Sequence, residues 1–193
     1  MPLEKQYDRT EVLENATHAF WKHGYEATSI ADLVEKTGLS RGSLYDAFDG
    51  KRGLFLECLA HYDKQHRSDF LDEVAQDSRP RDAIVAVFEV AARPAKQTGL
   101  PPGCLIVNSA LEVSPHDPEV RMLVNQSLSN VEAFFKSKIS AALAEGSVSG
   151  AVDPEATAKL LLGLFLGLRV LVRSEMDQAA VSAVINHART LLT

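Results

Sequence analysis

Two short helical patterns separated by a tight turn constrain the fold of this chain more than any other feature of its sequence. They occupy residues 28–52, TSIADLVEKTGLSRGSLYDAFDGKR. Apolar residues recur every three or four positions in the first pattern, and Leu44 and Phe48 give the second a buried side. Gly38 tolerates the positive φ that a tight turn requires, and the Ser40 hydroxyl can cap the helix that follows. The spacing predicts a helix-turn-helix, two short helices packed at a steep angle.

The remainder of the chain also shows helical periodicity and contains no sustained strand-like alternation. We therefore predict an all-α fold. The helix-turn-helix belongs to an N-terminal three-helix unit, residues 1–52, and a larger helical domain follows in residues 53–193. Pro80 and Pro154 fit the first positions of helices, and a loop is expected over residues 94–103. About nine helices are expected, over residues 8–22, 29–37, 40–48, 51–77, 80–96, 104–111, 118–145, 154–175 and 177–191.

The charge balance excludes binding to nucleic acid through a general basic surface. The net charge is −6 over 193 residues, and residues 1–52 hold seven basic and nine acidic side chains. Any affinity for DNA must therefore come from the placement of a few cations and amides.

Cysteine content and the apolar runs lead us to expect a cytoplasmic protein with no membrane contact. Cys58 and Cys104, the only two cysteines, do not make a disulfide framework. The N-terminus lacks the apolar core of a signal peptide. The longest apolar run, Leu160–Val172, is interrupted by Arg169 and is shorter than the roughly 20 residues that span a bilayer.

The outer side of the second helix in the motif has the chemistry expected of a helix in the major groove of DNA. Arg41 stands at its N-terminal end, and a guanidinium can donate two hydrogen bonds to guanine O6 and N7. Gly42 and Ser43 leave room for close approach, and Tyr45 can offer its hydroxyl to a phosphate. Lys51 starts the next helix, where its charge and the free amides favour a phosphate. Taken one at a time, these residues also fit an ordinary solvated surface.

A close resemblance to the DNA-binding region of the TetR-type bacterial transcriptional regulators lies in residues 24–55, GYEATSIADLVEKTGLSRGSLYDAFDGKRGLF. It implies a homodimer that binds a near-palindromic operator in double-stranded DNA, usually as a repressor. It also implies a C-terminal domain that binds a small effector and dimerises. By motif position, the implied DNA contacts are Ser40, Arg41, Gly42, Ser43, Tyr45 and Lys51, with Thr28 and Ser29 at phosphates.

Two positions depart from the pattern of that family. Ala47 stands where many members carry a histidine, and Ala31 stands where many carry a basic or polar residue. Both changes remove a potential phosphate contact, and each lost ionic contact lowers the salt slope of binding by about one unit. The resemblance therefore implies DNA binding that depends more strongly on Arg41 and Lys51.

An almost wholly apolar helix near the C-terminus predicts a contact with a second copy of the chain. The run LLLGLFLGLRVLV, residues 160–172, is apolar on nearly every side, and a helix of that kind must be buried all round. Gly163 and Gly167, four residues apart, would let another helix approach closely. An internal core helix is the alternative. The predicted isologous interface uses Leu160, Gly163, Leu164, Gly167, Leu168, Leu171, Val181, Val184, Ile185 and Ala188 of the last two helices.

A pocket for the implied effector is expected among the C-terminal helices. Such pockets are mostly apolar with a few polar groups. The candidate lining residues are Val87, Phe88, Cys104, Asn108, Leu123 and Phe134, which fit core packing equally well. Cys104 also starts a short helix after a proline-rich loop, where helix amides favour a thiolate, so sensing of electrophiles or oxidants through this thiol is a second hypothesis. Burial as a small apolar side chain is the alternative.

No catalytic or metal site stands out in the sequence. The pairs His18–His23 and His61–His66 are each five residues apart, and the close cysteine and histidine spacing of zinc sites is absent. We therefore expect no cofactor and no enzymatic activity. A helical enzyme assembled from distant residues and a helical interaction protein are the alternatives. Specific, salt-sensitive binding to a palindromic duplex would separate a regulator from both.

Overall fold

A computed structural model describes residues 7–68, 70–72, 74 and 79–193 of the chain. Within these residues all regular structure is helical, which confirms the all-α prediction. None of the described helices is both long enough and apolar enough to cross a membrane. In chain order, the elements are α1 (Arg9–His23), α2 (Ile30–Thr37), α3 (Arg41–Phe48), α4 (Gly50–Tyr62), the π-helical segment η1 (Asp63–Ser68), α6 (Pro80–Ala91), α7 (Ala95–Thr98), α8 (Leu105–Glu112), α9 (Pro118–Ala144), α10 (Pro154–Arg173) and α11 (Gln178–Thr190).

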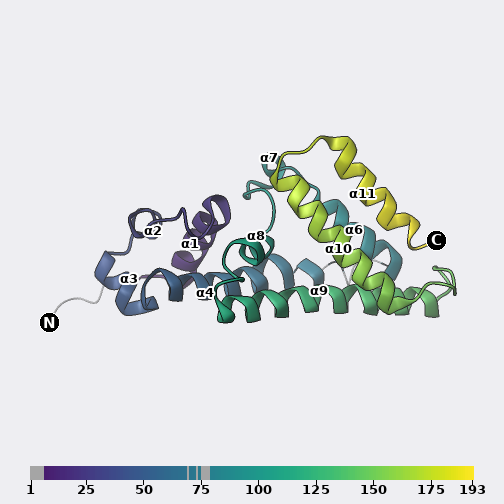
Figure 1. Ribbon diagram of the computed structural model, residues 1–193, viewed down its shortest axis with the longest axis horizontal. Helices are drawn as coiled ribbons and strands as arrows, with labels where there is room; N and C mark the ends of the chain where they lie inside the picture. The colour runs from purple at the N-terminus through teal and green to yellow at the C-terminus, as the bar shows by residue number, and fades with distance from the viewer. Residues whose placement is uncertain (1–6, 69, 73, 75–78) are drawn as a thin grey trace.

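The helices form an elongated molecule with two dissimilar ends. In Figure 1, α1, α2 and α3 lie at one end, and α6, α10 and α11 lie toward the other. The 27-residue α9 runs along the lower side of that view. It packs against α10 and α6 and also contacts α8 and α4. The helices α4 and α9 therefore form the main connection between the two ends.

Side-chain caps fix the starts of several described helices at positions that the sequence suggested. Asp8 accepts hydrogen bonds from the first-turn amides of α1. Asp117 and Asp153 do the same for α9 and α10, each followed by proline at the first helical position. Proline is favoured there because the N–H that it lacks would have no partner within the helix. These helix ends are therefore determined by local sequence.

One predicted helix is shorter in the structure than expected. The helix expected over residues 80–96 ends at Ala91, and the four-residue α7 lies in the stretch predicted as a loop. The residue before a proline is disfavoured in the α conformation, so Pro94 explains the break. The extra piece brings the α-helices in the described part of the chain to ten, against about nine predicted.

The helix predicted over residues 51–77 contains a π-helical segment. Helix α4 ends at Tyr62, and η1 continues directly from it. Residues 70–72 and 74 are again helical, and the predicted end near Asp77 lies outside the described residues. A π turn changes which side chains face the interior, and such turns are frequent at functional sites.

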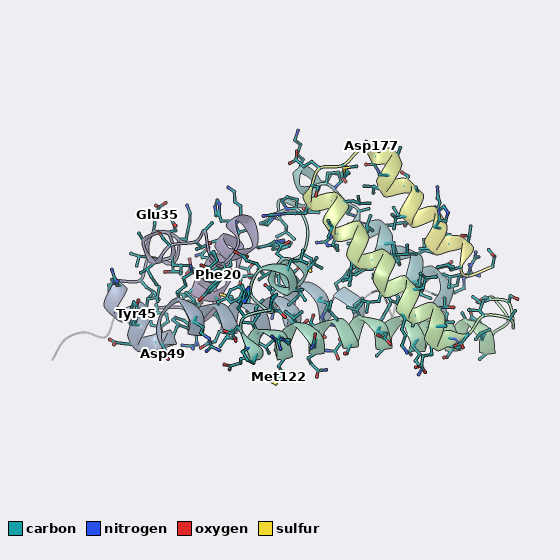
Figure 2. The ribbon with its side chains drawn as sticks, viewed as in Figure 1. Phe20, Glu35, Tyr45, Asp49, Met122 and Asp177 are labelled. Atoms are coloured by element: carbon teal, nitrogen blue, oxygen red, sulfur yellow. The ribbon has the colours of Figure 1, made fainter. Side chains whose placement is uncertain are left out.

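Two hydrophobic cores lie along the molecule. The N-terminal core contains Phe20 and Phe55, together with side chains from α8 and the start of α9 such as Val120. Figure 2 shows Phe20 among the N-terminal helices. The C-terminal core is built by α6, α9, α10 and α11 around Phe135. Because α4 crosses residue 52 and contributes to the N-terminal core, the two predicted units share packing across their boundary.

Candidate nucleic-acid interface and effector cavity

The first helix of the motif, α2, is held by a reciprocal cap. Ser29 Oγ accepts a hydrogen bond from the Asp32 amide at 3.1 Å, and the Ser29 amide donates to Asp32 Oδ2 at 2.8 Å. The hydrogen bonds from the Ser29 hydroxyl and amide lower the pKa of the Asp32 carboxyl below its ordinary value. Ser29 is exposed, whereas Thr28 is buried and its hydroxyl donates to the Gly24 carbonyl at 2.6 Å. The Thr28 side chain therefore ties the end of α1 to the start of α2.

The second helix, α3, has an inner face fixed in the N-terminal core. Leu44 is fully buried and Phe48 nearly so. Ser40 Oγ caps the helix by accepting a hydrogen bond from the Ser43 amide at 3.0 Å, and the two serine hydroxyl oxygens are 2.8 Å apart. The predicted cap and the predicted buried side are thus both present, and together they set the direction in which α3 projects.

The outer face of α3 has a cation, Arg41, and a phenol, Tyr45, on either side of Gly42, which has no side chain. Arg41, Gly42 and Tyr45 are exposed, and Figure 2 places Tyr45 at the end of the molecule remote from α10 and α11. The Arg41 guanidinium carbon lies 5.9 Å from the Tyr45 ring centroid. A Cβ on Gly42 would meet only Ser40 Oγ, at 3.8 Å, so nothing within the subunit requires glycine there. A guanidinium beside an open helix face can reach base edges in a major groove.

Lys51 lies in the first turn of α4, where its amine already contacts the protein. Nζ is 3.4 Å from the Glu26 carbonyl oxygen and 4.4 Å from the centroid of the Tyr25 ring. Asp49, which precedes α4, makes no side-chain hydrogen bond to the helix start. The Lys51 cation therefore stands where the segment between α1 and α2 meets the N-terminus of α4, a helix end that favours anions.

The turn from α3 to α4 depends on a glycine with no predicted role. A Cβ on Gly53 would lie 1.8 Å from the Phe48 carbonyl oxygen, so a larger residue requires movement of the backbone. Asp49, between the two helices, has φ 56° in the left-handed region. The signal was present in the Gly50–Gly53 spacing directly after α3.

Two charged side chains hold the end of α1 and the segment after it against the C-terminal helices. Glu112, the last residue of α8, accepts hydrogen bonds from the amides of Tyr25 at 3.0 Å and Glu26 at 2.8 Å. Arg173, the last residue of α10, donates to the Lys22 carbonyl at 3.0 Å. The last carbonyls of a helix lack partners within it, so Arg173 supplies a donor for Lys22, while Glu112 supplies an acceptor for two amides of the loop between α1 and α2. The contacts join segments 86 to 151 residues apart, and no local pattern predicts them.

A cavity of about 150 Å³ lies where α1 meets the C-terminal helices. Its mostly apolar wall comes from α1, α4, η1, α6, α8, α9, α10 and the loop before α8. Val87 and Cys104 line it, as the pocket prediction requires. Phe88 instead lies in the C-terminal core, where its ring stacks on Phe135 at 5.8 Å between centroids. Three other residues predicted to line the pocket, Asn108, Leu123 and Phe134, are not part of the wall.

Polar groups in the cavity wall come chiefly from residues with no predicted role. Trp21 is 3% exposed, and its Nε1 has no hydrogen-bond partner among the described residues. Arg169 donates to the carbonyls of Ala91, at 2.7 Å, and Gly103. The signal for Arg169 was its place in the apolar run Leu160–Val172, because a charge on an apolar helix needs a polar partner.

The two cysteines have different environments. Cys58 is fully buried, and burial raises the pKa of its thiol to about 12. Cys104 is half-buried, lines the cavity, and accepts a hydrogen bond at Sγ from the Tyr62 hydroxyl at 3.3 Å. Burial, followed by the neighbouring Cys104 sulfur, raises the pKa of Tyr62 well above its usual value, so Tyr62 stays a donor. Of the two thiols, only Cys104 is placed to meet a molecule in the cavity.

An apolar strip on α10 and α11 is exposed in the single subunit. Of the ten predicted interface residues, Leu168, Val181 and Ala188 are buried in the subunit's own core, and the other seven are exposed or half-buried. A Cβ on Gly163 or Gly167 would meet nothing within 4 Å. A shallow groove beside the strip is lined by Leu160, Leu164, Ala183, Val184, His187, Thr190 and Leu191.

Two short capped helices joined by a tight turn, the second with a small and polar outer face, define a helix-turn-helix DNA-binding protein. Residues 12–58 match the model of the bacterial regulatory proteins of the tetR family, and residues 80–188 match the tetracyclin repressor-like C-terminal domain. The chain belongs to the TetR family. It is a DNA-binding transcriptional regulator and not an enzyme, so the resemblance stated from residues 24–55 is confirmed.

Similar proteins match over nearly the whole chain. The uncharacterized HTH-type transcriptional regulator YezE of Bacillus subtilis (strain 168) is 30% identical over 181 residues, 92% of this chain and 93% of that protein. The HTH-type transcriptional repressor ComR of Escherichia coli (strain K12) is 29% identical over 193 residues, 97% and 89% of the two chains. A cysteine mutant of the TetR family regulator CifR, solved with 26-bp double-strand operator DNA, is 29% identical with a TM-score of 0.84, covering 98% of each chain.

Proposed function

We propose that the chain is a repressor that binds a palindromic operator as a homodimer and leaves it when a small molecule occupies the cavity. The observation that supports this most directly is the outer face of α3, which is exposed while its inner face is anchored in the core. ComR is named a repressor, and the CifR structure contains operator DNA. Residues 1–52 then serve DNA binding and residues 53–193 serve effector binding and dimerisation, in the cytoplasm where bacterial DNA lies.

The proposed DNA contacts follow from exposure and chemistry. Arg41 reads a guanine, and Tyr45 and the small α3 residues bring the helix close to the backbone. Thr28 is left out because its hydroxyl is used inside the subunit. The assigned contacts are Ser29, Ser40, Arg41, Gly42, Ser43, Tyr45 and Lys51.

The proposed dimer pairs α10 and α11 with their counterparts in a second copy. The two α3 helices of a dimer must lie about 34–36 Å apart to enter successive major grooves. Glycines on the exposed strip of α10 would let the partner helix approach closely, while its leucines supply apolar area. The surface-accessible members are Leu160, Gly163, Leu164, Gly167, Leu171, Val184 and Ile185, and the buried Leu168, Val181 and Ala188 support them from within.

Effector control is proposed to act through the end of α1. Trp21 belongs to α1 and also lines the cavity. Glu112 and Arg173 hold backbone groups just beyond it, so α8 and α10 are tied to the DNA-binding helices. A ligand can shift the protein only through its different affinity for two conformations. Occupation of the cavity then favours a position of α1 that changes the distance between the two α3 helices.

The test of DNA recognition is selection of bound duplexes from a random pool, with Arg41→Ala beside the native chain. Enrichment of one palindrome that the variant fails to enrich is expected. Arg41 is exposed, so the variant should have the same melting temperature as the native chain. A loss of enrichment would then report the loss of a DNA contact and not of the fold. If the folded native dimer enriches no sequence, specific operator binding without a ligand is excluded.

A second candidate is release of DNA by covalent modification of Cys104. The observation that favours it is the exposure of this thiol to the cavity, beside a Tyr62 hydroxyl that donates to it. N-ethylmaleimide is expected to alkylate Cys104 and spare the buried Cys58, as mass spectrometry of peptides would show. Operator release by the reagent should disappear in Cys104→Ser. If the variant is released equally well, the thiol is not the sensor.

A further inference from the structure

We infer that the cavity between α1 and α10 binds a small apolar molecule carrying a carboxylate, with Arg169 and Trp21 as its polar contacts. The inference names the class of effector, and it rests on the proposed function only for the regulatory role of the cavity. The cavity itself, its size and its polar groups are features of the single subunit.

The size and walls of the cavity set the apolar part of the ligand. A cavity of about 150 Å³ lined by apolar side chains can hold benzene. This cavity has the same volume, and Val87, Val131 and Phe165 contribute apolar wall. A six-membered ring or a short alkyl chain therefore fits, and a large polycyclic molecule does not fit without movement of the helices.

Arg169 supplies a positive charge that no carboxylate of the described residues offsets. Its hydrogen-bond partners there are the Ala91 and Gly103 carbonyls, which orient the guanidinium but carry no charge. A guanidinium has five N–H donors, so this arrangement leaves others for a ligand. Half-buried charge in an apolar site is stabilised by an anion, and a carboxylate matches the guanidinium fork in shape.

Two acidic side chains, Asp63 and Glu14, contact residues of the cavity wall and are engaged with them. Asp63 accepts hydrogen bonds from Arg67 and Ser127. Glu14 lies beside two histidines, 2.8 Å from His61 and 3.4 Å from the His66 ring. Two further arginines line the cavity: Arg67, which is paired with Asp63, and Arg93, which is exposed and adds positive charge at the cavity. The local field therefore attracts anions.

Trp21 provides the second polar contact. Its indole N–H is buried and has no partner in the described part of the chain. A buried donor without an acceptor is unfavourable, and a ligand oxygen in the cavity would supply that acceptor. Tyr62 is already a donor to Cys104, and Arg169 uses the nearby carbonyls. The His66 ring nitrogen Nε2, also in the wall and without a hydrogen-bond partner among the described residues, can donate or accept according to its tautomer. The Trp21 N–H and the remaining Arg169 N–H groups are donors, and both match the oxygens of a carboxylate.

The experiment uses the fluorescence of Trp21, the single tryptophan of the chain. The full chain is titrated with benzoate and hexanoate, and separately with benzyl alcohol and hexanol, which have similar size without the charge. Because a charge-assisted hydrogen bond is roughly twice as strong as a neutral one, we expect Kd values at least about tenfold lower for at least one acid than for its alcohol. Equal or weaker binding of both acids, or no binding by any of the four, would overturn the inference.

Three variants separate the charge from general packing. Arg169→Met should raise the Kd of the acid about tenfold or more and leave the alcohol within about threefold, whereas Arg169→Lys should retain the preference for the acid. Arg121→Met is the matched control, since Arg121 also donates to two backbone carbonyls but lies outside the cavity wall. An Arg121→Met effect as large as that of Arg169→Met contradicts the assignment.

Two further results keep the inference testable and distinct from the proposed function. If Arg169→Met does not fold, the inference is still tested by comparing the Kd values of the acids and the alcohols with the native protein. Trp21→Phe, followed by calorimetry, should weaken acid binding because the N–H is lost. Operator binding without ligand is measured in parallel: an intact operator complex with no preference for acids rejects the inference alone, whereas acid binding by a chain that recognises no operator rejects the proposed function alone.

Discussion

Helices α3 and α10 both expose one face in the single subunit, but the two faces have opposite chemistry. Around Gly42, α3 presents Arg41 and Tyr45, whereas around Gly167, α10 presents leucines such as the half-exposed Leu160. Because glycine has no side chain, the helix backbone at the centre of each face is open to close approach. The neighbours determine what can approach: a cation and a hydroxyl match phosphates and base edges, and leucines match another apolar helix. In the proposed function, Gly42 and Gly167 each permit a close approach, and the residues around them select the partner.

The largest effect is expected from blocking the α10 face. Gly167→Leu adds a side chain where a Cβ meets nothing within the subunit, so the monomer should fold while close approach of the partner is prevented. Without the second half-site contact, operator affinity should fall at least about a hundredfold. Sedimentation and operator titration measure the two effects. Gly150→Leu, at another open glycine outside these helices, is the control. If Gly167→Leu still forms a dimer and binds the operator with native affinity, the proposed interface is wrong.

The α3 face is tested by comparing two glycines of the same region. Gly53→Ala should cost about 2–3 kcal/mol in the free energy of unfolding, because the added methyl overlaps the Phe48 carbonyl. Gly42→Ala should be neutral or stabilise by up to about 1 kcal/mol, because the site is open and alanine favours helix. Urea unfolding gives both values. Weaker operator binding by the stable Gly42→Ala would show close approach of DNA, and unchanged binding would contradict it.

The link between the two regions is tested at Glu112. Glu112→Ala removes the acceptor for two backbone amides and should cost about 1–2 kcal/mol in the free energy of unfolding. It should also reduce the change in operator affinity caused by a bound ligand, because α8 is then no longer tied to the segment before α2. Glu57→Ala, which removes an exposed partner of Arg9, serves as control. If a ligand still changes the operator affinity of Glu112→Ala as it does in the native chain, the cavity and the DNA-binding helices are coupled through other contacts.

The smallest effect is expected at the start of α9, which supports both regions. Asp117 caps α9 and accepts from Arg52 at 2.7 Å, and chiefly this hydrogen bond lowers the Asp117 pKa to about 2. Asp117→Ala should cost about 1 kcal/mol at neutral pH. Since the pKa is lower in the folded state than the unfolded value of about 3.9, the stabilisation is complete above about pH 4 and is lost as pH falls toward 2.

The measurement for Asp117 is chemical unfolding of native and variant chains at several pH values between 2 and 7. The difference in unfolding free energy between them should shrink as the pH falls through this range. Asp153→Ala removes a similar cap from α10 in which no arginine takes part among the described residues. A pH-independent difference for Asp117→Ala would show that the Arg52 contact contributes nothing.

The α3 region could be predicted because its determinants are close in sequence. The turn at Gly38, the cap at Ser40 and the buried positions Leu44 and Phe48 lie within eleven residues, and each has a local physical signature. Apolar patterning also identified the α10 strip. It could not separate buried Leu168 from the exposed face, because the surrounding core is assembled from helices distant in sequence.

The cavity could be predicted only in part, because its wall brings together residues far apart in the chain. Trp21 and Arg169 are separated by most of the sequence, and neither lies in a pattern that points to the other. Val87 lies in the cavity wall, whereas its neighbour Phe88 packs in the C-terminal core. Successive helix positions diverge by about 100°, so an error of one residue changes the face entirely.

The length of α3 limits how much sequence one subunit can read. Its eight residues span about 12 Å, the length of three or four base pairs at roughly 3.4 Å each. Four base pairs specify about one sequence in 256, and two half-sites about one in 65,000, against about a million or more competing sites in a genome. If only the base pairs read by the two recognition helices were specified, tens of sites in a genome would match by chance. Discrimination of the true operator must then draw also on the shape and deformability of the DNA between and beside the half-sites.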